Sequence, residues 1–274
     1  MIYERWTPPA PLDRFIQNLW YWETDEPQSH AKDTIMASAH MGILINLRED
    51  ALRWYNGERF HLRNDLRGIA LCGTHANNFA IDALQPRMMG VRFQPGGAWP
   101  FFGPTGFDFY GRHLSLEEFW GRTRAHGVHM RLVETQGIAA KFKVLLRALL
   151  EHAPRPLEHS AAVSMALSRF DRAPLSARVK ATADDADLSQ KKFIRHFTQE
   201  VGFTPKLYLR VKRFQRLLDR VWTMRAVDWA PLAAEHGYYD QPHLIRDFRE
   251  FCGFTPTQYL ALRGPYQQHL PLPE

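Results

Sequence analysis

The sequence predicts an α+β protein with a β-rich N-terminal barrel, a helical connector and an all-α C-terminal domain made of two helix-turn-helix units. Three observations predict this class. Short apolar or alternating runs, separated by Gly, Asn, Asp and Pro, fill about the first 110 residues. From about residue 114 the apolar spacing becomes helical. The last third then contains two similar stretches, at residues 191–205 and 237–256. A chain of 274 residues is also long enough for more than one domain.

The expected strands of the N-terminal region are short and closely spaced, which favours a compact barrel or sandwich. They are Thr34–Leu47, Leu52–Asn56, Arg67–His75, Asn77–Ala83 and Arg87–Gly97. We expect this domain to cover residues 1–112.

Residues 113–172 are expected to form the helical connector. An apolar stripe recurs there at four, three and four residues and consists of Ile138, Phe142, Leu145 and Leu149. Residues 152–156 interrupt the pattern, and a second helical stretch follows at 157–170. Such a stripe is typical of a core or subunit contact.

The C-terminal domain, expected at residues 173–264, contains a repeat. The tetrapeptide Gly-Phe-Thr-Pro occurs at 202–205 and again at 253–256, an offset of 51 that also relates Arg195 to Arg246. In each copy the glycine can end one helix in the left-handed conformation, the threonine caps the next helix and the proline occupies its first turn. The tetrapeptide therefore predicts a corner between two helices.

A second matched signal precedes each corner and predicts a helix-turn-helix unit. Each copy has a small residue, then a turn residue four positions later, then a capping residue. These are Ala183, Asp187 and Ser189 in the first unit (residues 183–201) and Ala233, Gly237 and Asp240 in the second unit (residues 233–252). Aspartate adopts the positive φ that such a turn requires less readily than glycine does. The second turn is also one residue longer.

Helical spacing separates an inner from an outer face in each unit. Phe193 and Phe197 are expected to point inward in the first unit, and Leu244, Phe248 and Phe251 in the second. The outer residues are then Lys191, Lys192, Arg195 and Gln199, followed by Gln241, His243, Arg246 and Arg249, with Pro242 in a first turn. These residue types reach bases and phosphates in a major groove, although a solvated charged face is the alternative and His243 can be structural.

The charge distribution supports a polyanionic partner. The chain carries a net charge of +6, and residues 155–263 hold 18 Lys and Arg against 12 Asp and Glu, whereas the remainder holds 17 of each. A basic surface can also serve solubility alone. The helix that begins at Pro205 is expected to be about 24 Å long. It could hold two recognition helices in successive major grooves, about 34 Å apart.

The stretch from Ser176 to Leu262 resembles the AraC/XylS-type transcription regulators, and the resemblance rests on both GFTP corners, "YLRVKRFQRLL" and "GYYDQPHLIRDF". It implies two helix-turn-helix units joined by a long helix, with double-stranded operator DNA as the partner. By position, the base-contacting residues would be Lys191, Ile194, Arg195, Gln241, Pro242 and Arg246. Ile194 and Pro242 are apolar, so readout there would use methyl contacts or be absent.

Two N-terminal stretches, "HMGILINL" and "MGVRFQPGGAWPFFG", resemble the cupin-like β-barrel of one branch of this family. The resemblance implies a small-molecule effector or dimerisation, so a homodimer and contact with RNA polymerase are further expectations. The candidate effector residues are Trp22, His40, Trp54 and Arg92, together with Trp20, and Arg92 could anchor an anion. Ordinary core packing is the alternative for the aromatic residues.

The main alternative is a cupin-type metal-dependent enzyme that carries an accessory DNA-binding domain. Such a site usually needs an H-x-H pair and a carboxylate, whereas His40, His61 and His75 are isolated. We therefore expect no metal, no cofactor and no catalysis. A nucleoid-type protein that binds DNA without sequence preference is the third reading.

The location expected from the sequence is cytoplasmic. Cys72 and Cys252 lie too far apart in sequence to suggest a disulfide framework. The N-terminus lacks the pattern of a signal peptide, and no run approaches the roughly 20 apolar residues of a membrane span.

Overall fold

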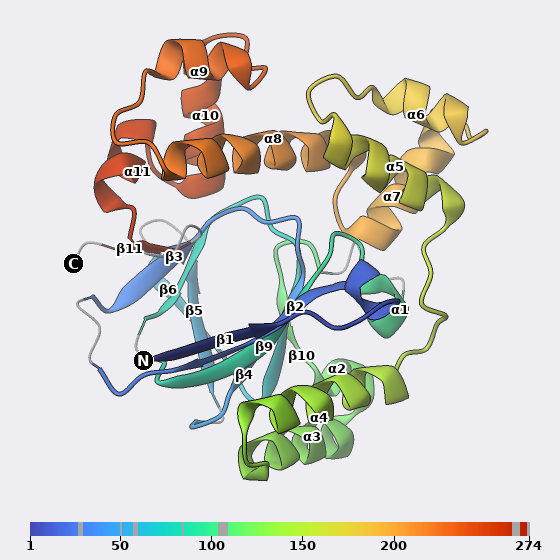
Figure 1. Cartoon of the computed structure of the whole chain (residues 1–274), viewed down its shortest axis with the longest axis vertical. Helices are drawn as coiled ribbons and strands as arrows, with labels where there is room; N and C mark the ends of the chain where they lie inside the picture. The colour runs from blue at the N-terminus through green and yellow to red at the C-terminus, as the bar shows by residue number, and fades with distance from the viewer. Residues whose placement is uncertain are drawn as a thin grey trace.

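The computed structural model has antiparallel β-structure in its N-terminal half and helices in its C-terminal half (Figure 1). It describes residues 1–26, 30–49, 51–56, 60–83, 85–103, 109–264 and 269–272. The strands are β1 (Ile2–Trp6), β2 (Ile16–Glu23), β3 (Lys32–Ile35), β4 (Gly42–Asn46), β5 (Leu52–Asn56), β6 (Leu62–Leu66), β7 (Ile69–Cys72), β8 (Phe79–Asp82), β9 (Arg87–Phe93), β10 (His113–Ser115) and β11 (His269–Pro271). The helices are η1 (Leu12–Arg14), α1 (Trp99–Phe102), α2 (Glu117–Trp120), α3 (Arg122–Glu134), α4 (Ile138–Glu151), α5 (Ala161–Arg172), α6 (Val179–Asp185), α7 (Gln190–Val201), α8 (Pro205–Trp222), α9 (Trp229–Glu235), α10 (Gln241–Cys252) and α11 (Pro256–Leu262).

The α+β class is confirmed, but the described strands form two antiparallel sheets and not a closed barrel. The first sheet has the order β1-β2-β9-β4-β7-β10, and the second has the order β11-β3-β8-β5-β6. The hydrogen-bond ladders end at β1 and β10 in one sheet and at β11 and β6 in the other, so the barrel expected from the sequence is an open two-sheet arrangement.

The run 34–47, which reads as one strand in the sequence, crosses from one sheet to the other. Its beginning lies in β3 of the second sheet, and its end lies in β4 of the first. Between them, Ser38 pairs with His75 in an isolated antiparallel bridge. The sequence does not reveal the break between the two strands, because most of the connecting residues, 36–41, are small or apolar.

One face of the first sheet packs against helices of the connector. Met89, Val91 and Phe93 alternate along β9 and are buried, as strand geometry requires for a face covered by helices. The predicted helical stripe lies in α4, where Phe142 and Leu149 join the same core. The other face of this sheet points toward the second sheet. The domain boundaries at residues 112 and 172 stay a prediction.

The C-terminal helices share a separate core in which the predicted inner faces are confirmed. Phe193, Phe197, Leu244, Phe248 and Phe251 are all fully buried in it. Helix α5 also contributes to this core. Both helix-turn-helix units are therefore packed around the same central helix, α8 (Figure 1).

Both predicted corners are confirmed. Gly202 and Gly253 adopt left-handed backbone conformations, with φ of 86° and 83°. The Thr204 hydroxyl accepts a hydrogen bond from the N–H of Leu207 at the start of α8, and Thr255 forms a capping box at the start of α11. The tetrapeptide thus ends one helix and begins the next in both copies.

The C-terminal helices rest on two N-terminal loops that the Ser38–His75 bridge joins. The Ala37 N–H donates to the Phe251 carbonyl near the end of α10 (2.8 Å), and the Thr74 hydroxyl donates to the Gly202 carbonyl after α7 (3.4 Å). The last strand, β11, pairs with β3 and so connects the end of the chain to the second sheet. Both units therefore contact the N-terminal domain at the C-terminal ends of their second helices, α7 and α10.

Candidate nucleic-acid interface

Each recognition helix begins at the capping residue that the sequence predicts. The Ser189 hydroxyl accepts a hydrogen bond from the Lys192 N–H (3.3 Å), and the Asp240 carboxylate accepts one from the His243 N–H (2.8 Å). A capped N-terminus starts the helix at a defined residue, which sets the rotation of its outer face. The predicted caps of α7 and α10 are confirmed.

The turns before these helices differ in the residue that supplies positive φ. Asp187 occupies this position in the first unit with φ of 53°, and Gly237 occupies it in the second with φ of 70°. Gly237 also faces Leu175, whose side chain would lie 3.2 Å from an added Cβ. The positive φ at position 237 therefore favours glycine, whereas the exposed Leu175 side chain can move aside.

The outer face of α7 is open to solvent. Lys191, Lys192, Arg195 and Gln199 are exposed, whereas Ile194 is half-buried and packs against the C-terminal core. The first four side chains can therefore reach a duplex. The role of Ile194 in base contact stays a prediction.

The outer face of α10 is similar. Gln241, Pro242, Arg246 and Arg249 are exposed. His243 is half-buried, and its ring contacts that of Tyr238 with a centroid distance of 5.2 Å. That contact gives His243 a structural role, which the sequence left open, in addition to any contact with DNA.

The cations on these outer faces are available for a ligand. Among the described residues, no carboxylate forms an ion pair with the five basic side chains Lys191, Lys192, Arg195, Arg246 and Arg249. A cation that is held in an ion pair would have to break that pair before it binds phosphate. These cations exchange only water and counterions.

The basic side chains on the inner side of the domain are paired instead. The buried Asp247 carboxylate on α10 accepts hydrogen bonds from Arg210 (2.7 Å) and Arg213 (3.3 Å) of α8. Arg210 also contacts Glu250 at 2.9 Å. Partial burial alone lowers the pKa of Arg210, but its hydrogen bonds to Glu250 and Asp247 raise it above the ordinary value. These cations stabilise the domain and are not presented to a ligand.

Helix α8 separates the two recognition helices. Its 18 residues give a length of about 27 Å. Figure 1 shows α7 near the start of α8 and α10 near its end. The length of α8 is of the order of the 34 Å between successive major grooves on one side of a duplex.

The candidate effector residues lie largely where the two sheets face each other. Trp22 of the first sheet and Trp54 of the second join one apolar cluster, and both are half-buried. The His40 ring donates a hydrogen bond from Nδ1 to the Phe93 carbonyl (2.8 Å). Burial, and next the nearby charge of Arg92, lowers the pKa of His40 to about 3.

His113 is a member of this region that sequence reasoning missed. Its ring lies 4.9 Å from that of Trp54 and 4.6 Å from that of Phe79. Burial, with a smaller contribution from His75, lowers the pKa of His113 to about 3, so its ring is neutral at neutral pH. His113 lies in β10, which is three residues long and pairs with β7. A strand this short has no recognisable pattern in the local sequence.

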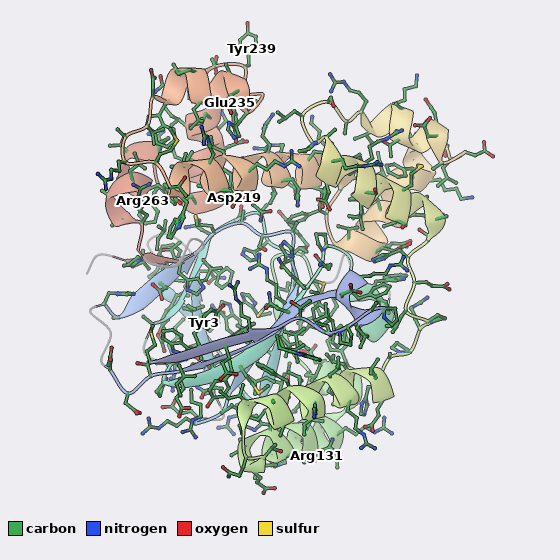
Figure 2. All side chains as sticks on the ribbon, in the orientation of Figure 1. Tyr3, Arg131, Asp219, Glu235, Tyr239 and Arg263 are labelled. Atoms are coloured by element: carbon green, nitrogen blue, oxygen red, sulfur yellow. The ribbon has the colours of Figure 1, made fainter. Side chains whose placement is uncertain are left out.

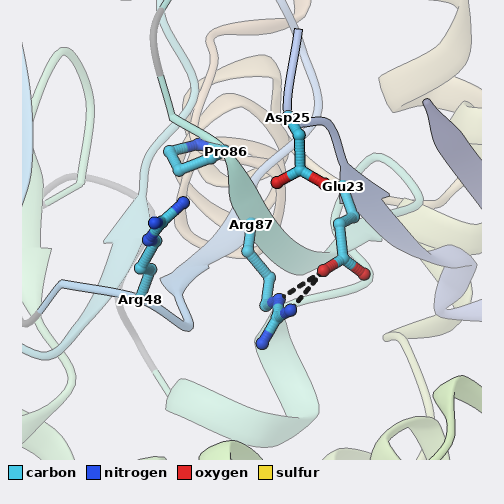
Figure 3. Close-up of a pocket in the computed structure, with 5 residues that line it drawn as sticks. All are labelled: Glu23, Asp25, Arg48, Pro86 and Arg87. Atoms are coloured by element: carbon cyan, nitrogen blue, oxygen red, sulfur yellow. Dashed lines mark hydrogen bonds and ion pairs between the residues drawn. The ribbon is translucent and has the colours of Figure 1, made fainter.

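A surface pocket of about 250 Å³ lies at the ends of β2 and β9 and is lined by Glu23, Asp25, Arg48, Pro86 and Arg87 (Figure 3). Arg87 pairs with Glu23, as the dashed lines show. The Tyr21 hydroxyl donates to Glu23 (2.6 Å) and lowers the pKa of that carboxyl. The two acidic and two basic side chains offset each other, so this pocket favours no strongly charged ligand.

The described residues contain no group of three or more His, Cys, Asp or Glu side chains placed to hold a metal ion. None of the described helices has the length and apolar character needed to cross a membrane.

Two known families match separate parts of the chain. Residues 4–115 match a domain of unknown function (DUF6597), and residues 182–261 match a helix-turn-helix domain. No curated protein matches the chain.

Solved structures with some similarity include those of ToxT from Vibrio cholerae. One ToxT structure is 9% identical, covers 95% of this chain and 98% of its own, and has a TM-score of 0.45. Unsaturated fatty acid bound ToxT is 10% identical over 88% of this chain and 93% of its own, with a TM-score of 0.42. At TM-scores below 0.5, these similarities support no inference about the present chain.

Proposed function

We propose that this chain is a DNA-binding transcription regulator that reads two neighbouring major grooves with α7 and α10. The helix-turn-helix domain matched at residues 182–261 supports the proposal. One observation carries the proposal. The basic side chains on the outer faces of both helices are exposed and have no ion-pair partner among the described residues, whereas those of α8 that face α10 are paired. The chain therefore presents two separate cationic surfaces.

The residue types on the two faces assign different tasks within this proposal. Arg195 and Arg246 are suited to bidentate hydrogen bonds with guanine, and Gln199 and Gln241 to adenine. Lys192, one residue after Lys191 near the start of α7, is suited to a phosphate contact that orients the unit without reading sequence. Ile194 and Pro242 can contribute only apolar contacts.

A small effector bound between the two sheets would modulate this activity. The side chains that support this part of the proposal are Trp22, Trp54, His40 and Arg92, which combine aromatic surface with a guanidinium group. The loops that carry His40 and His75 also contact the C-terminal ends of both recognition helices. A change in these loops would therefore reach both units.

Homodimerisation and contact with RNA polymerase are further parts of the proposal. Chemical crosslinking on operator DNA, with and without polymerase, would test both. A regulator of this kind is normally not an enzyme, and a cytoplasmic location fits its partner.

The test is selection of bound duplexes from a random pool. We expect a split motif whose two half-elements are separated by about one helical turn, roughly 10 base pairs. Enrichment without a motif would instead identify a nucleoid-type binder, and no enrichment would contradict DNA binding altogether.

A further inference from the structure

Tyr239 is the most exposed large hydrophobic residue in the described part of the chain, with 93% of its surface accessible. It lies in the turn of the second unit, directly before the capping residue Asp240 of α10. Figure 2 shows it at the outer tip of the molecule, beyond α9 and α10. Its neighbour Tyr238 is 4% exposed, so the turn buries one tyrosine and presents the next.

The backbone before Tyr239 is held in place. The Arg213 guanidinium donates to the Gly237 carbonyl (3.2 Å) and lies over the Tyr238 ring, 4.4 Å from its centroid. The Tyr238 N–H donates to the Ala233 carbonyl (2.9 Å). Tyr238, the residue before Tyr239, therefore contacts both α8 and α9.

The backbone at and after Tyr239 is held as well. The Tyr239 N–H donates to Nδ1 of His243 (3.4 Å), and the Asp240 carboxylate caps α10. An exposed tyrosine on a mobile loop would be unremarkable. Here the anchored backbone means that little freedom of the main chain is lost when the side chain binds a partner.

The first unit has no residue that corresponds to Tyr239. In that unit the capping residue Ser189 follows two residues after Asp187, whereas Asp240 follows three residues after Gly237. The additional residue of the second turn thus places an aromatic hydroxyl beside the N-terminal end of a recognition helix. In helix-turn-helix proteins this end enters the major groove, and the segments beside it meet the phosphate backbone.

We infer that the Tyr239 hydroxyl donates a hydrogen bond to a DNA phosphate that flanks the groove occupied by α10. This inference rests on the proposed function and adds a contact that only the second unit makes. The contact is neutral on the protein side, so it contributes affinity without releasing a counterion. It orients α10 on the duplex and carries no base preference.

The experiment compares Tyr239→Phe with the parent chain on selected and on random duplexes over a range of salt concentrations. Tyr239→Phe removes one hydroxyl and leaves the ring. We expect affinity to fall about 3- to 10-fold on both duplexes, with an unchanged slope of log affinity against log salt. Tyr3→Phe is the matched control, because Tyr3 is 48% exposed on β1, away from both units.

A methylphosphonate scan of the selected duplex locates the phosphate. Replacing the contacted phosphate should weaken the parent chain but leave Tyr239→Phe nearly unaffected at that position. Parent-like affinity of Tyr239→Phe, or a loss confined to the selected duplex, would overturn the inference. If Arg246→Ala also binds like the parent chain, the proposed function fails as well; if Arg246→Ala is weakened, only the role of Tyr239 is rejected.

Discussion

The two helix-turn-helix units share their caps and corners but are attached to the rest of the domain in different ways. In the second unit, the fully buried Asp247 binds Arg210 and Arg213 of α8. The residue at the same place in the first unit, 51 positions earlier, is His196, which is half-buried. The repeat therefore determines the elements, whereas the attachment of each unit depends on residues that the repeat does not share.

The first unit has one buried polar contact and one exposed ion pair. The Glu200 carboxylate of α7 is buried, accepts a hydrogen bond from the Ser160 N–H (3.2 Å) and lies 3.4 Å from Nδ1 of His159. Arg169 of α5 pairs with Asp185 of α6, and both side chains are partly exposed. Exposed pairs contribute little because water screens them. We therefore expect the loss of the Asp247 carboxylate to lower stability much more than the loss of the exposed Arg169–Asp185 pair.

The largest expected effect is the loss of the buried carboxylate. Asp247→Ala leaves two guanidinium groups without their shared partner and should lower the free energy of unfolding by about 3 kcal/mol. Asp185→Ala, which breaks the exposed pair between the first unit and Arg169 of α5, should cost about 1 kcal/mol or less. Urea unfolding of both variants measures the difference, and equal losses would show that the two attachments do not differ.

The next effect concerns the outer faces. Arg195→Ala and Arg246→Ala should each weaken binding to selected DNA by about 1–3 kcal/mol, because each removes a bidentate base contact. The control is Arg131→Ala, an exposed arginine of α3 at the far end of the molecule from Tyr239 (Figure 2). Titration of labelled duplexes gives the affinities. Unchanged affinity for either variant would remove that unit from the interface.

A smaller and sequence-independent effect is expected from Lys192→Ala. If Lys192 contacts a phosphate, its loss should weaken selected and random duplexes alike and reduce the salt slope by about one. The salt slope separates this charged contact from that of Tyr239. A slope equal to that of the parent chain would place Lys192 outside the phosphate contacts.

The smallest effects test the turns. Asp187→Gly should raise stability by up to about 1 kcal/mol, because glycine adopts positive φ without the cost of a Cβ. Gly237→Asp, which gives the second turn the residue of the first, should lower stability, because aspartate adopts a φ of 70° at a cost that glycine does not have. Thermal unfolding of the pair measures both. A stabilising Gly237→Asp would contradict the conformational requirement for glycine at this turn.

The features that the sequence predicted correctly depend on neighbours along the chain. The caps at Ser189 and Asp240, the corners at Gly202 and Gly253, and the inner faces of α7 and α10 all follow from residue type and spacing within a few positions. The residues of the candidate interface follow from the same spacing, since burying one face of a helix exposes the other.

The features that the sequence did not predict depend on contacts between distant segments. The strand β11 pairs with β3 across most of the chain, and β4 leaves the sheet of β3 although one apolar run contains both. The sequence also does not predict the contacts of Asp247 with Arg210 and Arg213, because an aspartate on a helix with many charged residues is expected to be exposed. Tyr239 was missed because exposure is not visible in a turn sequence.

The most direct test of two separate reading faces is to select DNA from a random pool with the parent chain, Arg195→Ala and Arg246→Ala in parallel. The proposal predicts that each variant loses base preference in a different half-element, about one helical turn apart. Loss of preference at the same positions in both variants, or at none, would contradict it.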